Sequence, residues 1–96
     1  MLDPNWKEIV IGTLKPYKPE RIGIFGSYAR GVNKVGSDLD ILVSLQKKVG
    51  LLKLIELEQS ISDKLGVEVD LLTENGLKNE HLKASIQKDV VTIFHE

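Results

Sequence analysis

The sequence predicts an α+β fold, in which short β-strands are interleaved with amphipathic helices. Three observations carry this prediction. An apolar, β-branched run over residues 21–26 ends in glycine, two later stretches alternate apolar and polar residues, and two longer stretches repeat apolar residues at helical spacing. With 96 residues and no internal repeat or linker-like tract, the chain is expected to form one domain over residues 1–96.

Asp3 and Pro4 predict the start of a first helix, as an N-cap and a first helical residue, and the helix is expected to run to about Lys15. Its apolar residues, at helical spacing, are Trp6, Ile9, Val10 and Leu14. Two prolines separate this helix from the first strand, Arg21–Gly26. One or two helical turns and a polar loop should follow that strand.

The second strand is expected at Asp38–Leu45. Period-2 alternation places Asp38, Asp40 and Leu42 on one of its faces and Leu39, Ile41 and Val43 on the other. A helix is then predicted over Leu51–Leu65 from its apolar residues Leu51, Leu54, Ile55, Ile61 and Leu65. Gly66 should end this helix as its C′ residue.

The third strand is expected at Val67–Thr73. It directs Val67, Val69 and Leu71 inward and places Glu68 and Asp70 on the opposite face. A last helix is predicted from the apolar residues Leu77, Leu82 and Ile86, and residues 90–94 suggest a short edge strand.

The composition excludes several classes of function. A net charge of −1 and a pI of about 6.1 give no long-range attraction to nucleic acids or anionic membranes, so direct binding to either is not expected. Because the chain has no cysteine, disulfides, thiolate catalysis and zinc-thiolate sites are excluded. No signal peptide or long apolar span is seen, which predicts a cytoplasmic location. So small a domain is expected to be modestly stable and to benefit from an oligomeric or heteromeric partner.

The two aspartates of the second strand point to a metal site. Asp38 and Asp40 should lie on one side of the strand, roughly 6–7 Å apart at Cβ. Each raises the pKa of the other unless a cation lies between them, and oxygen ligands without histidine or cysteine suit Mg²⁺ or Mn²⁺. Asp70 offers a third carboxylate. Three carboxylates on adjacent strands would make a two-metal site of the kind that supports in-line phosphoryl displacement.

The glycine and serine after the first strand point to a phosphate. Gly26 lets the backbone approach an anion closely, Ser27 adds a hydroxyl donor, and Arg30 can add a charged donor. Only ten residues separate Ser27 from Asp38, too few for a parallel crossover. The two strands are therefore expected to be antiparallel, with the phosphate and metal ligands at one edge of the sheet.

Each of these motifs is weak when taken alone. A Gly-Ser after a strand is usually an ordinary turn, and Asp-x-Asp and Asp70 can simply solvate an exposed strand face. Other phosphate and metal motifs fit less well, because the chain has no Walker-type P-loop, no G-x-G-x-x-G and no EF-hand spacing. The order and spacing of the motifs together favour one site.

The joint motif resembles a known signature. "GSYARG" (Gly26–Gly31), its spacing to Asp38 and "SDLDILV" (Ser37–Val43) are similar to the Gly-Ser … Asp-x-Asp signature of the DNA polymerase β-type nucleotidyltransferase superfamily. The length and the third strand resemble its minimal branch, often the antitoxin partner of a HEPN-domain toxin, a small helical ribonuclease. The resemblance implies a small mixed β-sheet flanked by helices.

The resemblance also implies roles for individual residues. Nucleotide triphosphate would be held by Gly26, Ser27, Arg30 and Ser37. Both metal ions would be bound by Asp38 and Asp40. Asp70 would join them at the metal that activates the acceptor hydroxyl, so these three carboxylates would be the catalytic residues.

The implied reaction is transfer of AMP from ATP to a hydroxyl, with release of pyrophosphate. In the antitoxin branch the acceptor would be a tyrosine of the HEPN toxin. Two alternatives stay open: a non-catalytic module that neutralises its toxin by contact, and transfer to a small molecule such as an antibiotic. Larger relatives carry an extra helical domain, for which 96 residues leave no room. Another molecule, in a hetero-oligomer or homodimer, is therefore expected to complete the site.

Overall fold

The computed structural model describes residues 4–32, 34, 36–76 and 79–96. Its elements, in chain order, are α1 (Trp6–Leu14), a 3₁₀ turn η1 (Lys15–Tyr17), β1 (Pro19–Phe25), α2 (Gly26–Arg30), β2 (Leu39–Leu45), α3 (Leu51–Leu65), β3 (Val69–Thr73), a 3₁₀ turn η2 (Glu74–Gly76), α4 (Glu80–Asp89) and β4 (Val91–His95). The predicted alternation of strands and helices is confirmed. No helix in the described part of the chain is long and apolar enough to cross a membrane.

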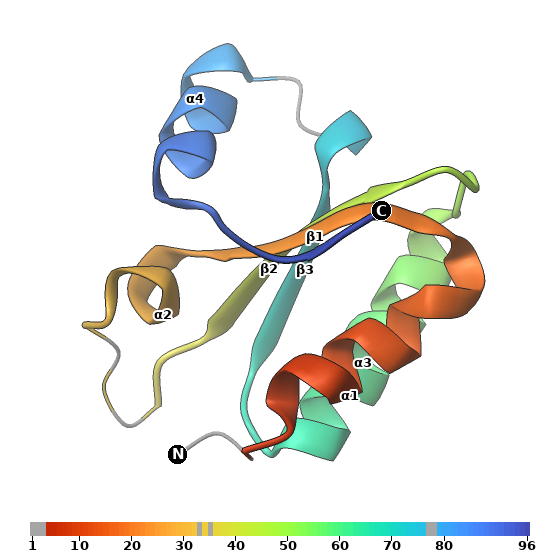
Figure 1. Cartoon of the computed structure of the whole chain (residues 1–96), viewed down its shortest axis with the longest axis horizontal. Coiled ribbons are helices and arrows are strands. Elements are labelled where there is room, and N and C mark those ends of the chain that lie inside the picture. The colour runs from red at the N-terminus through yellow and green to blue at the C-terminus, as the bar shows by residue number, and fades with distance from the viewer. Residues whose placement is uncertain (1–3, 33, 35, 77–78) are drawn as a thin grey trace.

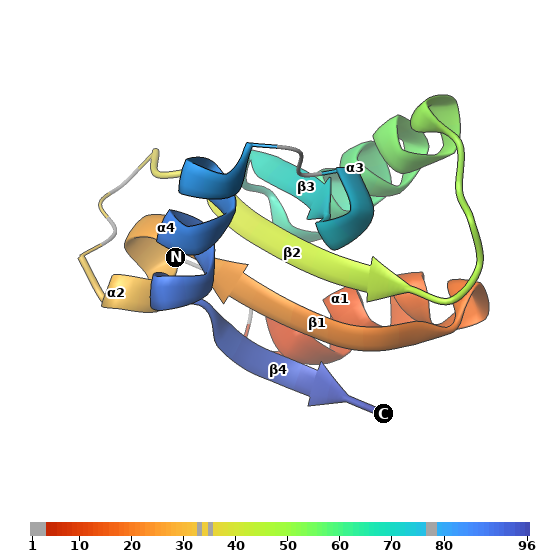
Figure 2. The ribbon, with the colours of Figure 1, turned by 90° about the horizontal axis from the view of Figure 1, so that it is seen from above.

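The sheet is mixed, with four strands in the order β3-β2-β1-β4. β1 pairs antiparallel with both β2 and β4, whereas β2 and β3 are parallel and are joined through α3. Both the predicted antiparallel arrangement of the first two strands and the mixed sheet are confirmed. α2 and α4 lie together at the end of the sheet where β1 ends and β2 begins (Figure 2).

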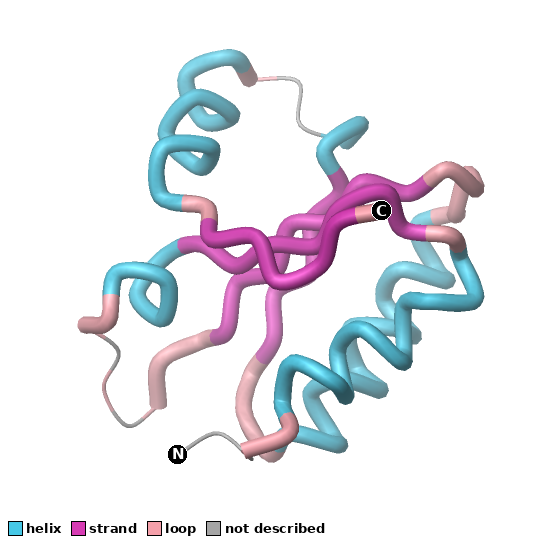
Figure 3. Tube along the Cα trace, viewed as in Figure 1, coloured by secondary structure: helices cyan, strands magenta, loops and turns pink. Residues whose placement is uncertain are grey.

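The helices divide between the two faces of the sheet. α1 and α3 lie side by side against one face, and α4 stands over the other (Figures 1 and 3). The main core lies between the sheet and the α1–α3 pair, and its buried residues are Val10, Leu14, Ile22, Ile24, Leu39, Ile41, Val43, Leu45, Leu57, Ile61, Leu65, Val69 and Leu71. Leu39, Ile41 and Val43, which were predicted to share one face of the second strand, all lie in this core.

The opposite face of the sheet carries a different set of side chains. By alternation along β2, Asp40, Leu42 and Ser44 lie on this face. Leu42 is buried, as is Ile86 of α4, whereas Asp40 is partly exposed. The sheet thus has one face that forms the core and one that offers polar groups near its α2 end.

β3 lies at the edge of the sheet, and one of its outward backbone groups is hydrogen-bonded to a side chain. The backbone N–H of Leu71 donates to a carboxylate oxygen of Glu58 on α3, at 2.8 Å. An edge strand otherwise presents unpaired backbone groups to solvent. Glu58 therefore covers part of this edge.

Some element boundaries differ from the prediction. α1 begins at Trp6 because the carbonyl of Asn5 accepts the first helical bond, from the N–H of Ile9 at 3.0 Å. The predicted N-cap, Asp3, lies outside the described residues. β1 begins earlier than predicted, at Pro19, which as the first residue of a strand needs no ladder N–H. Gly26 is part of α2 and not of β1.

The predicted starts of the second and third strands are each too early. The ladder between β2 and β3 begins with the pair Leu39 and Val69, so Asp38 precedes β2. Just outside the ladder, the N–H of Leu39 donates to the carbonyl of Glu68 at 2.8 Å. Asp38 therefore lies one residue before the strand that carries Asp40.

Two helices carry apolar side chains that do not pack into the core. α3 buries Leu57, Ile61 and Leu65, but in its first turns Leu51 is 73% exposed and Ile55 is 51% exposed. In α4 Ile86 is buried, whereas Leu82 is half-exposed. Leu77, the first of the three apolar residues that predicted this helix, lies outside the described residues.

Candidate active site

Gly26 lies against the carboxylate of Asp40. In the β1–β2 ladder Phe25 is paired with Asp40, so the chain leaves β1 directly beside that carboxylate. Gly26 then takes a φ of +72°, and a Cβ added to it would overlap the Oδ2 atom of Asp40. Only glycine fits both the backbone conformation and the space. The glycine-serine turn and Asp40 of β2 are thus in contact.

Asp70 lies next to Asp40 on the neighbouring strand. The two residues are register partners in the parallel β2–β3 ladder, whose strands lie about 4.8 Å apart. Burial, then a hydrogen bond to Asp70, then the negative charges of Asp70 and Asp38 raise the pKa of Asp40 to about 6, against an opposing effect of Arg30. An ionised Asp40 therefore lacks enough positive charge around it in the protein alone.

Asp38 completes the acidic group from the loop that precedes β2. It is exposed, and its charge contributes to the raised pKa of Asp40. Within the described residues, no three carboxylate, histidine or cysteine side chains are gathered closely enough to hold a metal ion together. The structure therefore brings together Asp40 and Asp70, with Asp38 nearby rather than converged on them.

The donor chemistry of this acidic group suits a hard divalent cation. All of its side-chain donors are carboxylate oxygens, which suit Mg²⁺ and Mn²⁺. A cation would also neutralise the repulsion that raises the pKa of Asp40. The residues present thus fit the predicted metal, and Asp40 and Asp70, which would be two of its ligands, are adjacent in the sheet.

Arg30 joins the site to α4. From the last residue of α2, its guanidinium Nη1 donates to Oδ2 of Asp89 at 2.9 Å, and its charge lowers the pKa of Asp40. Both side chains are partly exposed. Arg30 therefore lies within electrostatic reach of the carboxylates while Asp89 fixes its orientation.

The two predicted serines have different surroundings. Ser27 is the second residue of α2, and its carbonyl accepts from the N–H of Val32 at 3.0 Å. Ser37 uses its hydroxyl locally, as acceptor from the backbone N–H of Lys34 at 2.8 Å. The structure therefore places Ser27 beside Gly26 at the acidic group and gives Ser37 a role in shaping the loop that delivers Asp38.

Asp89 was missed by the sequence analysis. It is the last residue of α4, where the helix dipole disfavours a carboxylate unless a cation compensates it. That misplaced charge was the available signal, but the sequence did not indicate that Arg30, 59 residues away, is its partner.

A mixed sheet that brings a glycine-serine turn against paired strand carboxylates is the arrangement of a nucleotidyltransferase. Comparison with known proteins gives the same class. Residues 7–93 match the nucleotidyltransferase domain family, and the chain belongs to that family.

Among curated relatives, the protein adenylyltransferase MntA of Thermococcus cleftensis is 45% identical over 69 residues, which cover 72% of this chain and 70% of the relative. MJ1217 of Methanocaldococcus jannaschii, named provisionally as a protein adenylyltransferase, is 51% identical over 77 residues, or 80% of this chain and 79% of the relative.

Solved structures share the fold. A toxin–antitoxin pair with AMP-PNP contains a chain that superposes with a TM-score of 0.85 at 24% identity, over 94% of this chain and 73% of that one. A complex of tri-AMPylated Shewanella oneidensis HEPN toxin with its MNT antitoxin gives 0.77 at 22% identity, over 95% and 71%.

Proposed function

We propose that this chain is a metal-dependent protein adenylyltransferase that transfers AMP from ATP to a tyrosine hydroxyl of a partner HEPN-domain ribonuclease and thereby acts as its antitoxin. The relatives named as protein adenylyltransferases support the reaction. The structural relative complexed with an AMPylated HEPN toxin supports the acceptor. The observation that carries the proposal is the contact of Gly26 with Asp40, beside Asp70, because it joins a phosphate-binding turn to an acidic group.

The chain's own residues divide the work of binding. The backbone at Gly26 and the hydroxyl of Ser27 hold the triphosphate, and Arg30, fixed by Asp89, adds a positive charge to it. Ser37 acts indirectly, by shaping the loop that carries Asp38. The metal would be held by Asp38, Asp40 and Asp70, and when bound it supplies charge neutralisation at the α-phosphate and lowers the pKa of the acceptor hydroxyl.

The transfer forms one bond to the α-phosphorus and breaks one, and it moves one proton. The acceptor oxygen forms a bond to the α-phosphorus of ATP, and the bond from that phosphorus to the bridging oxygen breaks. Pyrophosphate leaves with the electron pair, and the hydroxyl proton passes to a carboxylate of the acidic group. We assign Asp70 as the carboxylate that accepts this proton. It lies on β3, one strand further from the glycine-serine turn than Asp40.

The proposal is tested by incubating the chain with α-labelled ATP, Mg²⁺ and the product of the neighbouring gene, which the proposal expects to be a HEPN-domain protein. The wild-type chain should label the partner and abolish its ribonuclease activity, and Asp38→Asn/Asp40→Asn should lose the labelling by at least a thousandfold. Glu8→Gln/Asp63→Asn is a matched control, since it removes two exposed carboxylates of α1 and α3. This control should label the partner as the wild type does.

The two alternatives give different results in the same assay. If the double aspartate variant neutralises the ribonuclease and no label appears with any variant, the chain is a binding module and the proposal is wrong. If label appears only on an added aminoglycoside or other hydroxyl-bearing small molecule, the chain is a nucleotidyltransferase with a different acceptor.

A further inference from the structure

A second surface lies at the end of the sheet opposite to the acidic group. It is a groove between the first turns of α3 and the end of β3, with a volume of about 190 Å³, and its apolar walls include Leu51, Leu54, Ile55 and Leu72. A neighbouring hollow lined by Leu45, Lys48 and Val49 shares Thr73 and Gly76 with it. Together these residues form what we call the α3 groove.

Three large apolar side chains in the α3 groove or beside it are exposed and do not pack into the core. Leu51 and Leu52 are 73% and 79% exposed, and Ile55 is 51% exposed. Leaving three large apolar side chains of adjacent turns in water carries a cost that scales with apolar area. Clustered exposure of this kind marks an interaction surface more often than scattered single residues do.

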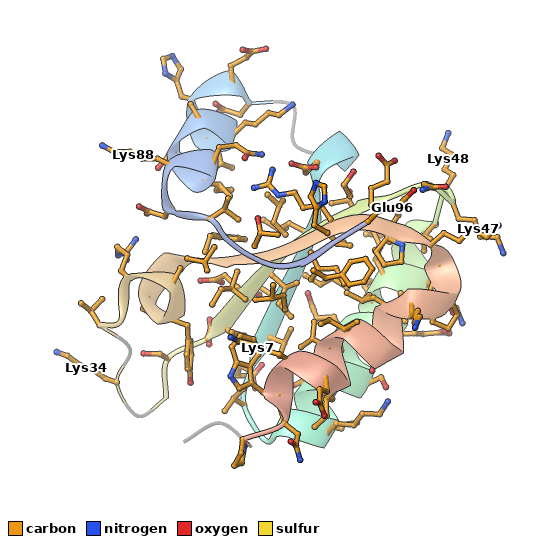
Figure 4. The ribbon with its side chains drawn as sticks, in the orientation of Figure 1. Lys7, Lys34, Lys47, Lys48, Lys88 and Glu96 are labelled. Carbon is orange, nitrogen blue, oxygen red and sulfur yellow. The ribbon has the colours of Figure 1, made fainter. Side chains whose placement is uncertain are left out.

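One end of the α3 groove is positively charged. Lys47 and Lys48 lie in the turn between β2 and α3, both exposed, and their side chains project into solvent (Figure 4). Among the interactions of the described residues, neither lysine has an ion pair. The N-terminus of the 15-residue α3, with its partial positive charge, lies at the same end.

The shape and charge specify the occupant. An apolar wall along two turns of a helix suits the apolar stripe of another helix, and a basic end suits carboxylates at one end of that stripe. We propose that the α3 groove docks an amphipathic helix of the acceptor protein, with its acidic end at Lys47 and Lys48. This proposal rests on the proposed function, since the docked protein is the one that receives AMP.

The position of the groove has a consequence for transfer. β3 runs from Asp70 near its start to Thr73 at its end, so the acidic group and the far end of the groove lie about 10 Å apart along the sheet. A docked helix of two turns spans a similar length. The partner is therefore bound at one end of the sheet, while a different segment of the partner presents the acceptor hydroxyl to the acidic group at the other end.

The test measures transfer of labelled AMP to the neighbouring HEPN-domain protein, with KM for that protein separated from kcat. Leu51→Glu/Ile55→Glu and, separately, Lys47→Glu/Lys48→Glu should each raise KM at least tenfold. At saturating partner, kcat should change less than twofold, as should the affinity for a fluorescent ATP analogue. The effect of the lysine variant should shrink at 0.5 M NaCl, because salt screens the wild-type attraction.

Matched controls make the same chemical changes elsewhere. Leu82→Glu places a glutamate at a half-exposed leucine of α4, and Lys7→Glu/Lys88→Glu reverses two exposed lysines on α1 and α4. Both should leave KM unchanged. Tm should stay within a few degrees for every variant, because the substituted side chains are all exposed.

The possible outcomes separate the two proposals. Absence of label with the wild type refutes the proposed function, whereas wild-type labelling that the groove variants retain with unchanged KM refutes the docking surface alone. If the chain is instead a dimer by sedimentation that Leu51→Glu/Ile55→Glu converts to a monomer with unchanged KM, the groove joins two copies and the docking proposal is wrong.

Discussion

Replacing Gly26 with alanine isolates the contact between the proposed phosphate-binding turn and Asp40. The substitution has two separable effects. It places a Cβ on a residue with φ of +72°, and it pushes that Cβ into the Asp40 carboxylate. Gly66→Ala serves as the comparison that separates the two effects. Gly66 has a φ of +71° at the end of α3, but a Cβ there would meet no described atom within 4 Å, so only the backbone effect applies.

The magnitudes follow from these two effects. A left-handed conformation costs a non-glycine residue about 1–2 kcal/mol, so Gly66→Ala should lower Tm by about 4–8 °C per kcal/mol in a domain of this size. Gly26→Ala carries that cost and also forces the carboxylate of Asp40 from its rotamer, for about 1 kcal/mol more. Because a displacement of about 1 Å at a reacting centre can cost roughly a hundredfold in rate, kcat should fall by about that factor.

The assay compares thermal unfolding and AMP transfer for the wild type and both variants, at a temperature where all are folded. Gly66→Ala should lose stability but keep its kcat within twofold. Gly26→Ala should lose both. Equal kcat values for the two variants would refute the reasoning, since backbone strain alone would then account for the substitution.

Two further predictions concern the charges of the site. The folded chain holds the Asp40 proton more tightly than the unfolded chain, with a pKa of about 6 against 3.8, so the free energy of unfolding of the metal-free protein should fall as the pH rises from about 4 to about 6. Asp40→Asn should remove this fall. In urea unfolding at pH 7 the variant should be more stable than the wild type by about 1 kcal/mol, after allowance for solvent screening. Equal stability of the variant and the wild type at pH 7 would contradict the raised pKa of Asp40. Arg30→Ala and Asp89→Ala should each raise KM for ATP about tenfold with little change in Tm, and the double variant should be no worse than Arg30→Ala. Additive losses in that cycle would show that Asp89 does not act through Arg30.

Local patterns predicted most of the fold because they coincide with its packing. Alternation along β2 placed Leu39, Ile41 and Val43 on one face, and all three lie in the core, while the short connection from Ser27 to Asp38 correctly favoured antiparallel strands. The strand starts were misplaced because ladder pairing, and not residue type, decides where a strand begins. Helical spacing in turn could not show that Leu51 faces solvent, because its pattern does not reveal where the sheet ends.

The candidate site was predictable where it depends on contiguous residues. The turn at Gly26 and the carboxylate of Asp40 were expected at one edge, and they are in contact. The link from Arg30 to Asp89 was not predictable, since it joins two helices distant in sequence. Period-2 geometry holds only within a strand, and Asp38 lies one residue before β2, next to Ser37, whose hydroxyl accepts from the backbone N–H of Lys34.

The hydrogen bond from the N–H of Leu71 to Glu58 affects the tendency of the unpartnered chain to aggregate. An open parallel edge can recruit strands from other chains and start aggregation. Glu58 occupies a backbone donor on that edge with a charged group at 2.8 Å, so an incoming strand would have to displace a carboxylate before it could pair there. A chain that leaves an apolar groove uncovered beside an edge strand thus offers one backbone donor fewer to which another strand could pair.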